Sequence, residues 1–199
     1  MERATVYRAI SAPTALVGGV SSIVCAAAFL LTRDRGSFFS LPISGAARQF
    51  IGVWVSVLAI TLLANTFFIW RKARRERRAF FSSGLRLAIA SALPAVIVAA
   101  VVTAMFWRSN ESAEILPILV TVWVTCYGLA LLATWSFAPP SLRMLGSAFL
   151  LAGIGCLLFM GALFTGDPRP GLWMTMAVTF GVFHIVYGVA TWPRNSSAE

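Results

Sequence analysis

His184 has the clearest capacity for chemistry in this chain, because it is the only histidine among the 199 residues and stands in a long apolar run. An imidazole can act as a general base, ligate a metal or change charge near neutral pH. Tyr187 follows three residues later and would share a helix face with it. Ionisable groups inside apolar, membrane-length segments are functional candidates by default. His184 and Tyr187 are therefore predicted either to contact a ligand or to join two helices.

Catalysis would need a nucleophile that His184 can deprotonate. The run from Phe183 to Gly188 superficially resembles the histidine helix of rhomboid proteases, which have a six-helix core. The matching fourth segment contains Cys126-Tyr127 and lacks that family's Gly-x-Ser-Gly, and the second segment carries Asn65 but no histidine. We therefore expect a protein that is not an enzyme, and an intramembrane enzyme using Cys126 is the third hypothesis for its function.

The composition of the chain also disfavours a cofactor. Membrane b-type cytochromes typically hold each haem between a pair of histidines, so a single histidine disfavours haem. A chlorin magnesium needs one axial histidine, which leaves a single-histidine pigment as an alternative role for His184. No CxxC spacing and no second histidine support a metal site around the three cysteines, Cys25, Cys126 and Cys156. We expect neither a metal nor a cofactor.

The remaining polar and aromatic candidates are Asn65, Trp123 and Tyr127, which also lie inside apolar segments. Each is of a type that commonly bonds or packs between membrane helices. Together with His184 and Tyr187 they would alternatively line an uncharged, aromatic cavity. Such a cavity suits a neutral or lipid-like molecule, so a transporter or binder of such a molecule is the second hypothesis.

The segments that hold these residues have the length and composition of membrane helices. The chain is 59% hydrophobic and only 12% charged, whereas soluble domains carry about 25% charged residues. A bilayer core requires about 20 apolar residues per helix. Six segments without Asp, Glu, Lys or Arg meet this requirement: 13–31, 49–70, 87–107, 115–138, 144–166 and 170–193. We predict an all-α bundle of six transmembrane helices, forming one domain over residues 1–199.

Tryptophans mark the predicted ends of these segments, as expected for side chains that favour the headgroup region. Five of the seven tryptophans lie at such ends: Trp70, Trp107, Trp135, Trp173 and Trp192. Basic residues indicate the orientation, because they concentrate on the cytoplasmic side. With the N-terminus inside, 11 Lys and Arg residues lie inside and 5 outside. We predict a multi-pass protein of the inner (cytoplasmic) cell membrane with both termini in the cytoplasm.

The loop after the second predicted helix dominates this asymmetry. It carries six basic residues in eight positions: Arg71, Lys72, Arg74, Arg75, Arg77 and Arg78. Near anionic lipid each contributes about 1 kcal/mol of membrane attraction, and Phe80 and Phe81 would dip into the interface. We expect an anchor on anionic headgroups, with docking of an acidic partner or a specific lipid as the alternative. Nucleic acid is not expected as a partner, because the loop is held at the membrane.

Small residues predict where helices approach closely. Gly181 and Gly188 lie on one stripe of the sixth segment with His184, and Gly146 and Gly153 are seven residues apart on one face of the fifth. We expect these glycines to pack against other helices, either of this chain or of a second copy. The leading hypothesis is therefore a non-enzymatic accessory, sensory or assembly protein that acts through helix–helix contacts. Its partner would be another membrane protein or a second copy of the chain.

A resemblance to a group of small bacterial six-helix membrane proteins supports the same architecture. It rests on the run from Met176 to Gly188, on Arg3-Ala4-Thr5 and on the basic loop. Members of that group are similar in having a Gly-Phe-Gly-Gly-Leu-His-Ile-Val-Phe-Gly type run, from which this chain departs at Val182-Phe183. The resemblance implies a fold and implies no activity, because the group has none assigned.

Overall fold

A computed structural model describes residues 11–32, 43–75, 77, 83–108, 115–136, 138–164 and 167–192. The predicted anchor residues Arg78, Phe80 and Phe81 and the side chain of Lys72 lie outside the described part of the chain. The described residues fold into helices joined by turns, which confirms the all-α class. The helices are α1 (Ala12–Thr32), α2 (Ile43–Arg75), α3 (Ser83–Arg108), α4 (Leu116–Leu132), α5 (Pro140–Leu158), α6 (Met160–Leu163), α7 (Pro168–Met176), the π-helix η3 (Ala177–Phe183) and α8 (His184–Ala190).

Five of these helical stretches are long and apolar enough to cross a membrane, with α7, η3 and α8 counted as one continuous rod from Pro168 to Ala190. The sixth, α4, is apolar but has only 17 residues, at the lower end of the range for a spanning helix. It ends earlier than predicted because the chain turns at residues 133–136. There the Thr134 hydroxyl donates to the Leu131 carbonyl at 2.7 Å and satisfies one of the last backbone acceptors.

The first five residues of the predicted basic loop after the second segment are helical. α2 continues past Trp70 to Arg75, because the added residues are Ala, Lys and Arg, which are good helix formers. Their positive charges also interact favourably with the C-terminal end of the helix dipole. The 33 residues of α2 extend over about 50 Å at 1.5 Å per residue. This length exceeds a bilayer core of about 30 Å, so α2 is longer than an upright crossing requires.

The fifth predicted segment, 144–166, is interrupted. α5 begins at Pro140, which suits the first position of a helix, and includes Arg143 in its first turn. The chain leaves α-helical geometry at Phe159, and α6 follows as a single short turn. The helix thus begins four residues before the predicted start at 144, and the described part of the segment is helical up to Leu163 apart from the break at Phe159.

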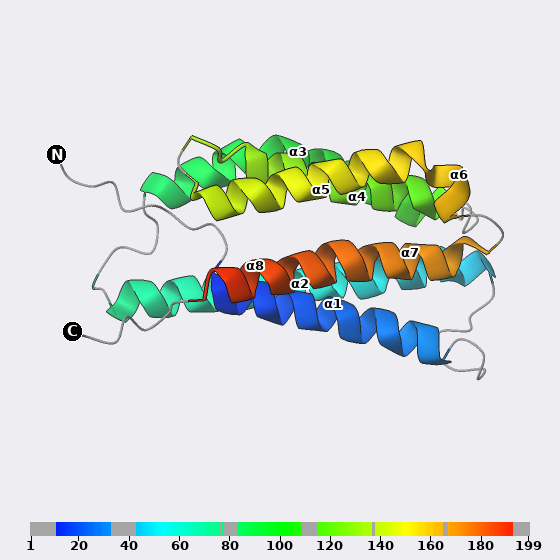
Figure 1. The fold of residues 1–199 in the computed structure, drawn as a ribbon, viewed down its shortest axis with the longest axis horizontal. Helices are drawn as coiled ribbons and strands as arrows, with labels where there is room; N and C mark the ends of the chain where they lie inside the picture. The colour runs from blue at the N-terminus through cyan, green and yellow to red at the C-terminus, as the bar shows by residue number, and fades with distance from the viewer. Residues whose placement is uncertain are drawn as a thin grey trace.

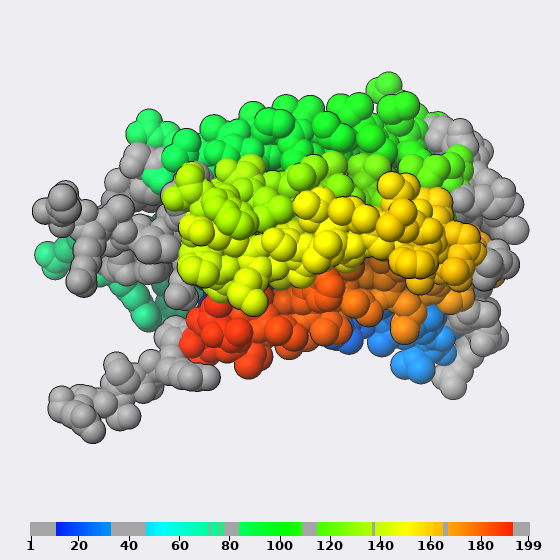
Figure 2. All heavy atoms as spheres, turned by 45° about the horizontal axis from the view of Figure 1, so that its top comes forward, coloured from blue at the N-terminus to red at the C-terminus, as the bar shows by residue number. Residues whose placement is uncertain are grey.

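The helices form two stacked layers of three (Figure 1). One layer contains α3, α4 and α5, and the other contains α2, α1 and the α7–η3–α8 rod. Successive helices run up and down, so the end of α2, the start of α1 and the end of α8 meet at one end of the bundle. We call this end, which carries Arg74 and Arg75, the arginine end. In the space-filling view α5 and the α7–η3–α8 rod lie side by side across one face (Figure 2).

Glycines bring the helices within each layer close together. A Cβ on Gly181 would lie 2.6 Å from Ile23 Cγ1 of α1, and one on Gly188 would lie 2.8 Å from Leu16 Cγ. In the other layer, a Cβ on Gly146 would lie 3.0 Å from Leu131 Cβ of α4, and one on Gly153 would collide with Thr125. All four predicted packing glycines thus face another helix of the same chain. Their close contacts are not available to a second copy.

Candidate functional site

The candidate site is centred on His184, the first residue of α8. Its ring is almost completely buried, with 4% of the residue exposed. Its Nε2 atom and the hydroxyl oxygen of Tyr127, on α4, are 2.7 Å apart and hydrogen-bonded. α4 and α8 belong to different layers, so this bond connects the two layers through the middle of the bundle. The structure thus brings Tyr127 and His184 into direct contact, and Tyr187 lies near enough to Tyr127 to interact with it electrostatically.

The second nitrogen of the ring, Nδ1, is buried and makes no hydrogen bond of acceptable geometry with the described residues. With the proton on Nδ1, the Tyr127 hydroxyl donates to Nε2, and Nδ1–H faces the backbone of Thr179 and Phe180. Both of these residues belong to η3. In a π-helix the carbonyls bond five residues ahead rather than four, and such segments frequently accompany functional sites. The π-helical turn directly precedes His184 and supplies the backbone next to Nδ1.

Aromatic rings surround the Tyr127–His184 pair and fill the space between the layers. Phe149 of α5 is completely buried at the centre of this group. Its ring centroid lies 4.6 Å from Tyr127, 5.0 Å from Phe180, 5.5 Å from Phe183 and 5.4 Å from His184. These separations are those of direct aromatic contact. The rings contact one another and leave the imidazole no direct route to a ligand.

Two other predicted site residues, Asn65 and Trp123, lie in separate contacts. Trp123 Nε1 donates to the Thr103 hydroxyl at 2.8 Å, joining α4 to α3. The Thr14 hydroxyl donates to Asn65 Oδ1 at 3.1 Å, joining α1 to α2. Tyr187 is buried on α8. Asn65 and Trp123 therefore bond within a layer, apart from the Tyr127–His184 bond between layers.

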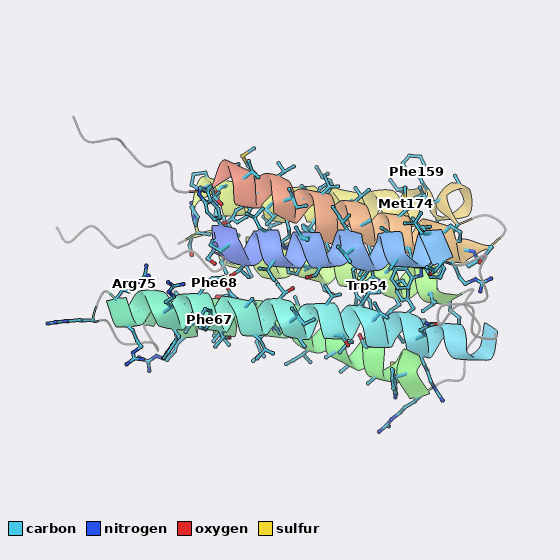
Figure 3. The ribbon with its side chains drawn as sticks, turned by 90° about the horizontal axis from the view of Figure 1, so that it is seen from below. Trp54, Phe67, Phe68, Arg75, Phe159 and Met174 are labelled. Carbon is cyan, nitrogen blue, oxygen red and sulfur yellow. The ribbon has the colours of Figure 1, made fainter. Side chains whose placement is uncertain are left out.

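A second aromatic group, which sequence reasoning missed, lies toward the opposite end of the bundle. It contains Phe29, Phe50, Trp54, Trp123 and Trp173. Trp173 was predicted to lie in the headgroup region, but it is only 3% exposed and stacks on Phe29 with ring centroids 4.6 Å apart. The ring of Trp173 thus packs inside the bundle and is not exposed at its surface, which differs from the expectation of a ring in contact with headgroups. The early signals were Trp54 and Trp123, which both stand inside their predicted segments. Trp54 also points into the bundle (Figure 3).

The hollow beside this group is small. Its lining includes Trp173, Phe50, Gln49 and Arg169, and its volume is about 10 Å³. A cavity needs a volume of about 10–15 Å³ to hold a single water molecule. The hollow therefore has no room for an organic ligand in this conformation.

The four other tryptophans at segment ends, Trp70, Trp107, Trp135 and Trp192, are between 43% and 53% exposed. Two of them carry an arginine over the ring. The guanidinium carbon of Arg74 lies 5.0 Å from the centroid of Trp70, and that of Arg143 lies 5.0 Å from Trp135. Both are cation–π distances.

The described residues that were predicted to contact headgroups are exposed, as such contacts require. The side chains of Arg71, Arg74, Arg75 and Arg77 are exposed. Arg77 follows α2 with a positive φ of 50°, so the chain turns sharply there. Among the described residues, no group of three His, Cys, Asp or Glu side chains is arranged to hold a metal ion.

Comparison with known proteins assigns no family: no protein-family model, curated protein or solved structure matches the chain.

Proposed function

We propose that the chain is a six-span protein of the inner cell membrane, with both termini in the cytoplasm, which acts as an accessory or assembly protein by binding a membrane-spanning partner. α4 would be its sixth span, since 17 apolar residues suffice where the bilayer is locally thin. The side chains that could have bound a ligand or taken part in catalysis instead form hydrogen bonds within the chain. His184 bonds Tyr127, and Trp123 bonds Thr103. Cys126, the one candidate nucleophile, neighbours Tyr127, which already occupies Nε2 of the only histidine.

The observation that carries this proposal is the exposure of α3. Only 6% of the residues in its most apolar stretch are buried, against 44% in the rod from Pro168 to Ala190. α3 packs against α4, but it touches α2 only sparsely. Its outward side is a continuous apolar surface that includes Leu93, Ile97, Val101 and Met105. Helices in a bilayer associate through such van der Waals surfaces.

The four glycines that were predicted to serve helix association are already in contact with other helices of this chain, whereas the apolar side of α3 is exposed. Gly181, Gly188, Gly146 and Gly153 all face neighbouring helices. The second hypothesis, a transporter or binder of a neutral or lipid-like molecule, has less support. The rings around His184 contact each other, and the hollow near Trp173 holds about 10 Å³.

Crosslinking in intact membranes, followed by mild solubilisation and native mass spectrometry, tests the proposal. The wild-type chain should appear in a defined complex, and the mass identifies the partner as another protein or a second copy. Ile97→Trp with Val101→Trp keeps α3 apolar while changing its shape, and should abolish that complex. Leu151→Trp with Leu158→Trp, on exposed positions of α5, is the matched control and should preserve it. A wild-type chain that is monomeric and partner-free under these conditions contradicts the proposal.

A further inference from the structure

The arginine end holds two copies of the same small arrangement. Trp70 and Arg74 are one helical turn apart on α2, and Trp135 and Arg143 meet across the turn between α4 and α5. In both pairs the guanidinium lies 5.0 Å over an indole that is about half exposed. The second pair is outside the basic segment, so the sequence alone did not single it out. Two separate parts of the fold thus present the same pair at one end of the bundle.

The contact with the ring leaves the guanidinium able to bind an anion. A guanidinium carries five N–H donors in its plane, and a ring contact at 5.0 Å does not engage all of them. These donors form a planar fork that matches two oxygens of a phosphate. Neither Arg74 nor Arg143 makes an ion pair or hydrogen bond through its side chain with the described residues. Nε of Arg143 is buried, so its terminal N–H groups are the donors that an external anion can reach. A charged group without a partner is stabilised by an incoming anion.

The opposite end of the bundle provides a contrast. There Arg169 Nε donates to Asp167 Oδ1 at 2.9 Å, so its charge is balanced within the chain. Arg108, at the end of α3, is exposed beside Trp107 without an aromatic stack among the described contacts. Among the described residues, the pairing of arginine with an exposed tryptophan therefore occurs at the arginine end.

The position of the tryptophans in the membrane and the positive charge around them indicate which anion binds. Tryptophan favours the headgroup region, which places the stacked guanidinium at the level of lipid phosphates. Arg71, Arg75 and Arg77 are exposed close by in sequence to Arg74, and α2 projects beyond the neighbouring helices at this end (Figure 3). Such a positive surface attracts anionic more than zwitterionic lipid. We infer that Trp70–Arg74 and Trp135–Arg143 are two binding sites for the phosphate of an anionic phospholipid headgroup. This inference stands apart from the proposed function, because it requires no protein partner.

Lipid titration of the purified full-length chain tests the sites. Phosphatidylglycerol and phosphatidylcholine are each added to the detergent-solubilised protein, and bound lipids are counted by native mass spectrometry. Arg74→Gln and Arg143→Gln should each weaken phosphatidylglycerol binding about fivefold, and phosphatidylcholine binding should not change. Trp135→Leu should weaken it too, because the ring fixes the guanidinium. Arg108→Gln removes one exposed charge at the other end and should leave binding as in the wild type.

Three results would overturn the inference. If Arg108→Gln and Arg143→Gln weaken phosphatidylglycerol binding equally, the effect depends only on the net charge of the protein. Full binding by Arg143→Lys and by Trp135→Leu would show that neither the planar fork nor the ring matters. Displacement of the lipid by inorganic phosphate or by a soluble acidic peptide at similar concentrations would assign the pairs to a free anion or an acidic protein. Thermal unfolding without added lipid, expected to be unchanged in every variant, separates loss of binding from loss of folding.

Discussion

Tyr127 and His184 are 57 residues apart in the sequence and are hydrogen-bonded at 2.7 Å between the two layers of the bundle. Within each layer the helices approach through glycines, as at Gly181 and Gly146. Between the layers the space is filled by bulky aromatic rings, with Phe149 in the middle. The fold thus combines close backbone packing inside a layer with side-chain packing between layers. The Tyr127–His184 hydrogen bond is a directional polar contact among the aromatic and apolar side chains that lie between the layers.

Removing the Tyr127 hydroxyl should destabilise the bundle without unfolding it. Tyr127→Phe keeps the ring contacts with Phe149 but leaves Nε2 of His184 buried and without its partner. The expected loss in unfolding free energy is about 1 kcal/mol, since hydrogen bonds between membrane helices are modest. Unfolding in mixed micelles measures it.

A double-mutant cycle separates this bond from general packing. Tyr127→Phe and His184→Leu should couple by about 0.6–1.7 kcal/mol. Thr66→Val is a matched control, because the Thr66 hydroxyl is exposed and bonds the Leu62 carbonyl of its own helix. Its substitution should be additive with His184→Leu. Zero coupling between Tyr127 and His184 contradicts a functional hydrogen bond between the layers.

The contact between α1 and η3 should tolerate no added methyl group. A Cβ on Gly19 would lie 2.9 Å from the Gly181 carbonyl oxygen and 2.7 Å from Ile185 Cγ1. The carbonyl belongs to a helix backbone and cannot rotate away, so Gly19→Ala must push the two helices apart. We expect a loss of about 1–3 kcal/mol in unfolding free energy.

Two other glycines provide the control for that substitution. A Cβ on Gly52 or Gly155 would have nothing within 4 Å. Gly52→Ala and Gly155→Ala should therefore leave stability unchanged or raise it by about 0.5–1 kcal/mol, because alanine favours helix. If Gly19→Ala behaves like these two variants, α1 does not pack against η3 as described.

Orientation can be tested at two described positions outside the helical rods. Arg77 follows α2 at the arginine end, and Asp167 precedes α7 at the opposite end. With the termini in the cytoplasm, Asp167→Cys should react with an impermeant maleimide on intact cells. Arg77→Cys should react only after permeabilisation. The wild type, whose cysteines lie in apolar helices, measures the background. The reverse labelling pattern would invert the proposed topology.

The sequence predicted the helical class and the approximate positions of the helices, because long uncharged runs leave the backbone no alternative in lipid. It did not predict η3, since a π-helix depends on how Phe180 and His184 pack rather than on local propensity. Asn65, Trp123 and Tyr127 were recognised as polar or aromatic residues inside apolar runs. Which of them would meet His184 was beyond prediction, because that depends on the faces that α4 and α8 present to each other.

Trp173 was predicted to lie at the membrane surface from its position in the sequence, but it is buried in the structure. It therefore differs most from the other tryptophans at segment ends, which are exposed. Its ring packs on Phe29 and lies 5.5 Å from Trp54, so Trp173→Ala should open a cavity between the layers. We expect a loss of about 3 kcal/mol, the lower edge of the range for soluble cores, because lipid already offers apolar surroundings to the unpacked residue. Trp107→Ala, at an exposed position, should change the unfolding free energy by less than about 0.5 kcal/mol. If both substitutions change thermal unfolding in detergent equally, Trp173 is not packed inside the bundle, and the prediction that it lies in the headgroup region is favoured.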